Sequence, residues 1–214
     1  MVCGTAPESG YRSLNVIDST FFIHGTKYLS LKNHSDSLRV MGAPYMAMDG
    51  INEMGLACGV LEIKSKATKQ KTGKKPIITT VALRAVLDKC ATVDEAIELF
   101  SSYDMHDSLF INYHYQFADA AGNSAIIEYV DNKMHVIRQK KEGDSLILTN
   151  YFLTPGGDNH DGRGYDRYER IEKNLSEKDG TLTEDEATRL SEAALRAHRA
   201  LGLGSYSRID FILD

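Results

Sequence analysis

The stretch Asp49-Gly50-Ile51-Asn52-Glu53-Met54-Gly55-Leu56-Ala57 decides how this 214-residue chain folds. Asp-Gly followed by Asn-Glu is typical of a tight turn, because Gly and Asn tolerate positive φ and an Asp side chain bonds its own backbone. The largely apolar run that follows, residues 56–63, has the length of a buried strand. The stretch therefore predicts a tight turn that leads into a strand of the core.

Helix and strand patterns alternate along the rest of the chain. Apolar residues spaced by three and four predict a helix at 77–88, and Thr92 with Glu95 forms a capping box that begins a second helix, which runs to about Ser101. Further helices are predicted at 167–175 and 184–201. Strands are predicted at 13–22, 113–118, 124–130, 133–138 and 146–150, with a hairpin turn at 119–123. This order predicts an α+β fold whose sheets are covered by helices on their outer faces.

Composition excludes several classes of function. The net charge of −5 argues against a nucleic-acid partner, which requires a basic face. No stretch of 18 apolar residues is present, so we expect no membrane span, and no charged-then-apolar leader opens the chain. Three widely spaced cysteines form neither a disulfide framework nor a zinc site. We therefore expect a cytoplasmic protein without a metal or cofactor.

Four further motifs follow the opening stretch in a fixed order. They are Leu83-Arg84-Ala85-Val86-Leu87-Asp88-Lys89-Cys90-Ala91-Thr92-Val93-Asp94-Glu95-Ala96, His114-Tyr115-Gln116-Phe117-Ala118-Asp119-Ala120-Ala121-Gly122, Ile126-Ile127-Glu128-Tyr129 and Leu148-Thr149-Asn150-Tyr151. In this order, the five motifs resemble the choloylglycine hydrolase and penicillin V acylase family of N-terminal-nucleophile amide hydrolases. The resemblance extends from about Pro7 to Ile171.

The resemblance implies a fold and a reaction. The fold is the four-layer αββα sandwich, incomplete here at its N-terminus, with a hydrolase-like body at 1–180 and a helix-strand segment at 181–214. The reaction is hydrolysis of a linear amide, as in conjugated bile acids, penicillin V or acyl-homoserine lactones. The nucleophile is an N-terminal cysteine whose own α-amino group acts as the base. A catalytically inactive member that binds an acyl or amide ligand is the alternative, and a homo-oligomer is expected if a sheet edge is left open.

Three residues are the candidates for the site. Asn150 matches the family asparagine that stabilises the reacting carbonyl, and Arg167 matches the family arginine near the nucleophile. Cys3 is the third candidate, although Val2 precedes it after removal of Met1, so that Cys3 has no free α-amine without further cleavage. The nucleophile is therefore Cys3, a cysteine upstream of Met1, or absent.

Other residues that could carry chemistry receive structural interpretations. Glu62 stands where some bile-salt hydrolases carry an asparagine oxyanion donor, and a carboxylate cannot donate unless it is protonated. His114, Cys58 and Cys90 are expected in the core. The tail resembles a piece of D-alanine–D-alanine ligase, in which Asp210 would bind magnesium, but one carboxylate is a poor magnesium site. A helix and strand that complete the fold are the simpler interpretation.

Overall fold

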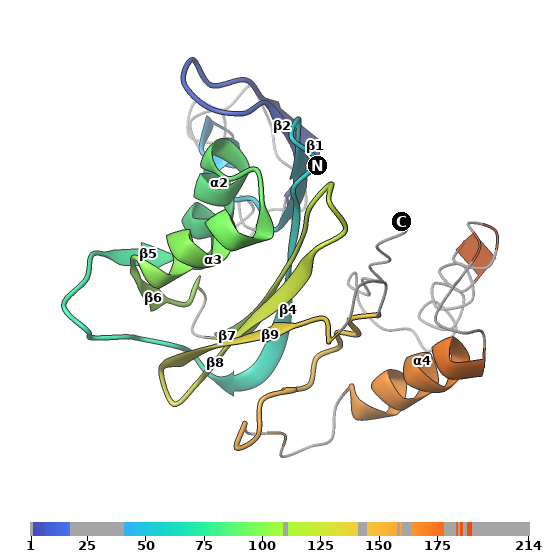
Figure 1. The fold of residues 1–214 in the computed structure, drawn as a ribbon. Coiled ribbons are helices and arrows are strands. Elements are labelled where there is room, and N and C mark those ends of the chain that lie inside the picture. The colour runs from blue at the N-terminus through green and yellow to red at the C-terminus, as the bar shows by residue number, and fades with distance from the viewer. Residues whose placement is uncertain are drawn as a thin grey trace, which may run out of the picture.

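The main body of the protein is one seven-stranded antiparallel sheet. The computed structural model describes residues 2–17, 41–108, 111–140, 145–157, 159, 164–177, 183, 185, 188 and 189. The strand order is β1-β2-β3-β4-β7-β8-β9 (Figure 1). These strands are β1 Val2–Thr5, β2 Ser13–Val16, β3 Asp49–Asn52, β4 Ala57–Lys66, β7 Ile111–Ala118, β8 Ser124–Val130 and β9 Lys133–Arg138.

Helices cover one face of this sheet. They are α2, Thr79–Lys89, and α3, Val93–Ser101; the latter begins with the predicted capping box at Thr92. A small parallel pair, β5 Pro76–Ile78 and β6 Asp104–His106, flanks them. A further helix, α4 Tyr165–Glu177, lies apart from α2 and α3 (Figure 1). The predicted α+β class, with antiparallel strands under a helical layer, is confirmed.

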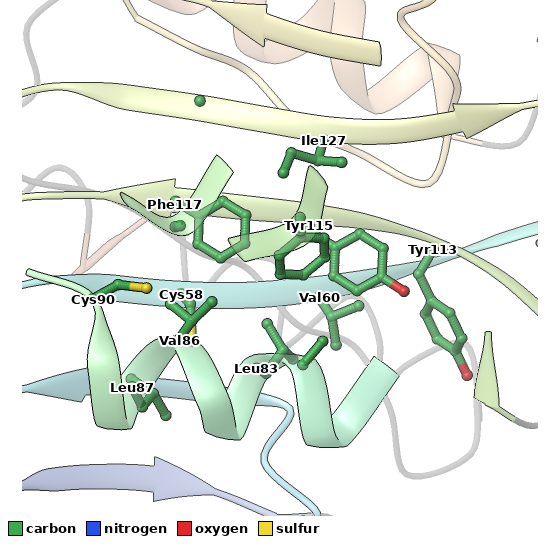
Figure 2. Packing of buried hydrophobic residues seen from close by; sticks show 14 of the residues in the cluster. Cys58, Val60, Leu83, Val86, Leu87, Cys90, Tyr113, Tyr115, Phe117 and Ile127 are labelled. Carbon is green, nitrogen blue, oxygen red and sulfur yellow. The ribbon is translucent and has the colours of Figure 1, made fainter. Parts of the chain in front are cut away.

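The core lies between the sheet and helices α2 and α3. Side chains alternate along each strand, so one row of aromatic residues on β7 meets the helices. Tyr115 is fully buried and makes an edge contact with Phe100 of α3, with ring centroids 4.8 Å apart; Phe117 contacts the same ring (Figure 2). Leu83 and Val86 of α2 complete this packing.

The two internal cysteines lie in this core, as predicted. Cys58 and Cys90 are 7% and 3% exposed and pack near Val86 (Figure 2). Burial raises the pKa of the Cys58 thiol to about 12 and that of Cys90 to about 11. Both thiols are therefore protonated at neutral pH and unreactive, since the thiolate is the nucleophilic form.

Two predictions along the chain were wrong. The predicted turn is observed at 53–55 and leads into β4, but residues 49–52, predicted as part of that turn, form a strand, β3. Gly50 is required for close packing, because a Cβ there would lie 2.7 Å from both the Leu14 carbonyl and a methyl group of Leu87. Residues 146–150, predicted as a strand, have no regular structure, because the chain leaves the sheet after β9.

Some predicted elements lie partly or wholly outside the described residues. The predicted strand at 13–22 is observed as β2, which ends at Val16, and residues 18–22 lie outside the described residues. Most of the predicted helix at 184–201, and Asp210, also lie outside them. Strands β1, β5 and β6 were not predicted. A four-layer sandwich requires two large sheets, and the described residues contain a single large sheet beside the small β5–β6 pair.

Asn52 explains why the opening stretch decides the fold. It is 5% exposed, and its Nδ2 donates to the carbonyls of Leu87 and Cys90 at 3.1 and 2.7 Å. Its Oδ1 accepts from the amides of Met54 and Leu56, both at 3.1 Å. One buried side chain therefore closes the turn between β3 and β4 and also binds the C-terminal end of α2.

We expect replacement of Asn52 by Ala to lower the free energy of unfolding by about 3 kcal/mol, because two carbonyls and two amides lose their partner in a buried place. Urea denaturation measures the loss. Asn174→Ala is the control, since Asn174 lies exposed on α4 and its side chain donates to the Arg170 carbonyl of the same helix. Equal losses in the two variants would contradict this role of Asn52.

Candidate functional site

The candidate site is built on a short irregular segment, residues 149–154, which we call the strap. Val60, Tyr115 and Ile127 are cross-strand neighbours on the face that carries α2 and α3. His114 and Glu128 lie one position along their strands and so face the opposite side. The strap contacts these two residues, and therefore crosses the sheet on the face away from α2 and α3.

Asn150 and Arg167, two of the predicted site residues, are in direct contact. The amide of Tyr151 donates to the Thr149 carbonyl at 2.7 Å, which forms a three-residue turn centred on Asn150. From this turn the Asn150 side chain meets α4, where Nη2 of Arg167 donates to its Oδ1 at 2.9 Å. The structure thus joins two positions that are 17 residues apart in the chain.

The contact with Arg167 orients the amide of Asn150. An arginine can only donate, so the atom that it meets must be the amide oxygen, and the NH2 group points the other way. One hydrogen of that group reaches the Glu62 carbonyl, with Nδ2 and O 2.6 Å apart. Among the described residues, no acceptor takes the second hydrogen. Asn150, which is half-buried, therefore presents an N–H donor with a fixed orientation.

Glu62 takes part through its backbone. Residues of β4 alternate in the direction of their carbonyls, and the Leu56 carbonyl bonds Asn52 on the β3 side. The Glu62 carbonyl therefore also points away from β7, beyond the last pairing of β3 with β4 at Asp49 and Gly59. The sequence placed Glu62 at a family oxyanion position, and the structure puts its carbonyl, rather than its carboxylate, against Asn150.

Cys3 is not brought to Asn150. It lies in β1 opposite Asn15, and the same row of the sheet continues through Gly50 to Cys58 on β4. Three strand spacings of about 4.8 Å and four residues of about 3.4 Å along β4 then separate it from Glu62, roughly 20 Å in all. Nucleophilic attack needs the reacting atoms about 3 to 3.5 Å apart.

Two functional residues were missed by the sequence analysis. His114 and Glu128 are both fully buried, with Nδ1 and Oε1 2.8 Å apart. The Glu128 carboxylate also accepts from the strap, from the Leu153 amide at 2.9 Å and the Thr154 amide at 2.8 Å. The predicted hairpin turn at 119–123 could have revealed this pair, since strands joined by that turn set residue 114 opposite residue 128. His114 is a core residue, as expected, but it is paired with a charge.

The other end of the strap is attached to the start of α4. Oγ1 of Thr149 donates to the Gly164 carbonyl at 2.9 Å. The ring of Tyr151 lies against those of Tyr165 and Tyr168, with centroids 5.1 and 6.2 Å apart. The sheet, the strap and α4 therefore form one continuous set of contacts around Asn150.

Comparison with known proteins identifies the family. A family model described as acyl-coenzyme A:6-aminopenicillanic acid acyl-transferase matches residues 15–199, most of the chain. The chain belongs to this family. The choloylglycine hydrolase and penicillin V acylase assignment made from the sequence is thereby confirmed.

Individual members of the acyl-transferase family match only in part. The penicillin V acylase of Pectobacterium atrosepticum is 38% identical over 113 residues, which are 48% of this chain and 29% of the relative. The penicillin V acylase structure from Agrobacterium tumefaciens shares 26% identity at a TM-score of 0.42, covering 61% of this chain and 33% of its own. A conjugated bile acid hydrolase variant from Clostridium perfringens shares 20% identity at the same TM-score, covering 61% and 36%. This family member thus spans about a third of these relatives.

The described part of the chain contains neither a metal-binding cluster nor a membrane-spanning helix. No group of three or more His, Cys, Asp or Glu side chains there is arranged to hold a metal ion. No described helix has the length and apolar character needed to cross a membrane.

Gly164 lets α4 approach Asn150. Its φ is +88°, and a Cβ there would lie 3.0 Å from the Asn150 amide nitrogen. We expect Gly164→Ala to lose about 1 kcal/mol from the left-handed backbone and to displace Asn150 as well. Gly156→Ala is the matched control, since Gly156 has φ +85° and open space around its Cβ position.

The two glycine variants are compared by urea denaturation and by the NMR signals of the Asn150 side-chain amide. Both should lose similar stability, and only Gly164→Ala should shift the amide signals. A shift of equal size in Gly156→Ala would show that the contact with Gly164 does not position Asn150.

Glu128 gives stability a defined pH dependence. Burial by itself raises its pKa, but the contact with His114 and the hydrogen bonds from the strap outweigh burial and hold the pKa below its ordinary 4.5. A depressed carboxyl pKa contributes stability that is present above the unfolded value and lost as pH falls through the folded value. We expect Glu128→Gln to be less stable than the unchanged protein by about 3 kcal/mol at pH 7, and the difference to shrink below about pH 4.5.

Urea denaturation between pH 7 and pH 3 measures this difference, with the exposed Glu8→Gln as a control that should show none. A difference between the unchanged protein and Glu128→Gln that stays constant with pH would mean that the charge of Glu128 is not what holds the strap.

Proposed function

We propose that this protein hydrolyses the C–N bond of linear amides, with Asn150 as a donor to the reacting carbonyl and Arg167 as the residue that orients it. The observation that carries the proposal is the Arg167–Asn150–Glu62 contact, because it fixes the direction in which the Asn150 amide N–H points. Substrates of this class are the acyl amides for which the relatives are named: penicillin V and conjugated bile acids.

The chemistry follows from the direction of that N–H. Attack on the amide carbonyl moves negative charge onto its oxygen, and a preorganised donor stabilises that charge by about 2.7 to 4 kcal/mol. The Arg167 guanidinium, exposed on α4, binds the amide oxygen of Asn150 and so keeps the N–H turned in its direction. The attacking thiol displaces the amine, which leaves with a proton, and water then cleaves the thioester to release the carboxylate.

The nucleophile is proposed to be a cysteine at a mature N-terminus. Its own α-amine titrates near 7.7 to 8.0 and can take the thiol proton at neutral pH. Cys58 and Cys90 are excluded by burial and raised pKa. Cys3 remains the candidate within this sequence, after cleavage before it and a movement of β1; otherwise a cysteine that this sequence does not contain supplies the thiol.

A second candidate function is binding without catalysis. The roughly 20 Å of sheet between Cys3 and Glu62 favours it, because a thiol so far from Asn150 cannot attack a carbonyl held there. In this alternative, the same donor recognises the carbonyl of an acyl or amide ligand, and no bond is broken.

The finer architecture is also a proposal. Val2, Leu14, Val16 and Ile51 lie on the face away from α2 and α3 and are 70%, 59%, 49% and 49% exposed. Exposed apolar patches mark surfaces that are covered by a partner. We propose a second sheet of the αββα sandwich, or another copy of the chain in a homo-oligomer, on this face. Free cysteines at all three positions support a reducing, cytoplasmic setting.

The first experiment separates catalysis from binding. The protein is incubated with penicillin V and with glycocholate, and the released amine is measured, while intact mass and iodoacetamide labelling locate the reactive thiol. We expect amine release, and a 100- to 1,000-fold loss of kcat in Asn150→Ala. Asn174→Ala is the control and should keep full activity.

Two results would contradict hydrolysis by this chain. One is a chain that begins at Met1 or Val2, labels slowly at all three thiols and releases no amine. The other is full activity in Asn150→Ala. In the first case, binding of penicillin V measured by calorimetry, and lost in Asn150→Ala, would support the second candidate function.

A further inference from the structure

The buried pair of His114 and Glu128 lies on the face of the sheet that carries the strap. Both side chains are fully buried, and removing a carboxylate from water is costly unless hydrogen bonds replace the water. The amides of Leu153 and Thr154 from the strap donate to the carboxylate, and Nδ1 of the His114 ring from β7 lies 2.8 Å from its Oε1. Two of the three compensating contacts therefore come from the segment that carries Asn150.

This arrangement gives the strap a directional contact with the sheet, which an apolar contact cannot give. Buried ion pairs are weak sources of net stability, and well-packed apolar residues often replace them without loss. Apolar contacts, however, are not directional. A carboxylate whose two oxygens accept from consecutive amides sets which residues of the strap face the sheet. A slip by one residue would move Asn150 by about 3.4 Å, more than the length of a hydrogen bond.

A continuous series of contacts along the strap connects Glu128 with Asn150. Phe152 is 3% exposed, and its ring packs edge-on against His114 with centroids 5.8 Å apart. The Phe152 amide donates to Oδ1 of Asn159 at 2.8 Å, so the strap is held at three successive residues. On the other side of Asn150, Thr149 bonds the Gly164 carbonyl. Asn150 therefore stands between two fixed points.

We propose that Glu128, supported by His114, is a positioning residue that sets the location of the Asn150 amide by fixing the register of the strap on the sheet. The effect of this positioning on catalysis rests on the proposed function, in which Asn150 donates to the reacting carbonyl. The positioning itself does not depend on that function, because it is a relation between residues of this chain.

The test replaces Glu128 by Gln and follows the strap by NMR in the full chain. Gln keeps the shape of Glu but turns an NH2 group toward at least one of the amides that a carboxylate oxygen accepted. We expect amide hydrogen exchange of Leu153 and Thr154 to become at least ten times faster, and the two Asn150 side-chain amide signals to move toward their values in an unstructured peptide. With penicillin V as the substrate, we expect kcat to fall 10- to 100-fold with little change in KM.

Asp119→Asn is the matched control, because Asp119 is also a buried carboxylate that accepts backbone amides. It is 9% exposed, follows the last residue of β7, and accepts from the amides of Val93, Ala121 and Asn123. It holds α3 and the hairpin turn, not the strap. At a comparable loss of stability, Asp119→Asn should leave the signals of Leu153, Thr154 and Asn150 unchanged.

The NMR outcomes decide the proposal whether or not the chain is active. Unchanged strap signals in Glu128→Gln, or equal changes in Asp119→Asn, would overturn it. If Glu128→Gln does not fold, His114→Gln takes its place, since it keeps the carboxylate and removes the ring that packs on Phe152; the same signals should move, by less, and their staying fixed would overturn the proposal. Absence of amine release in the unchanged protein counts against the proposed hydrolysis alone.

Discussion

The pairing of β4 with β7 is the constraint on which the rest of this structure depends. Its register sets Val60 beside Tyr115 and Leu61 beside His114, so it decides which residues meet α2 and α3 and which meet the strap. A slip by one residue would exchange the two faces, burying His114 among the aromatic rings of the core and turning Tyr115 toward the strap. The same pairing sends the Glu62 carbonyl toward the open side of β4, where Asn150 binds it.

The candidate site obtains its geometry from polar contacts on a sheet whose stability comes from apolar ones. The core of Tyr115, Phe117 and Phe100 supports the sheet from the helical side. On the other side, a single buried carboxylate and a single arginine define where one amide group lies and how it is turned. Glu128 determines the place of the strap, and Arg167 determines the direction of the Asn150 N–H. Position and orientation are thus controlled by separate charges on separate elements.

Membership of the acyl-transferase and penicillin V acylase family agrees with the contact between Asn150 and Arg167. The two positions that the family resemblance singled out, Asn150 for the reacting carbonyl and Arg167 near the nucleophile, lie together. The thiols lie elsewhere, two of them protonated in the core and the third on β1. A site with an oriented donor and a distant nucleophile is compatible with hydrolysis after a change at the N-terminus, and equally with recognition of an acyl ligand.

The sequence by itself determined what depends on near neighbours in the chain. The capping box at Thr92, the period of α2 and the hairpin of β7 and β8 were all predicted, because their hydrogen bonds and side-chain spacing act within a few residues. The family resemblance identified Asn150 and Arg167 as site residues, each separately. Only the tertiary structure decided that these two residues touch, that β3 is a strand, that Glu128 holds the strap and that Cys3 lies far away. Asn150 reaches Glu62 across 88 residues of sequence, and such contacts follow from sheet register and packing, which no local pattern specifies.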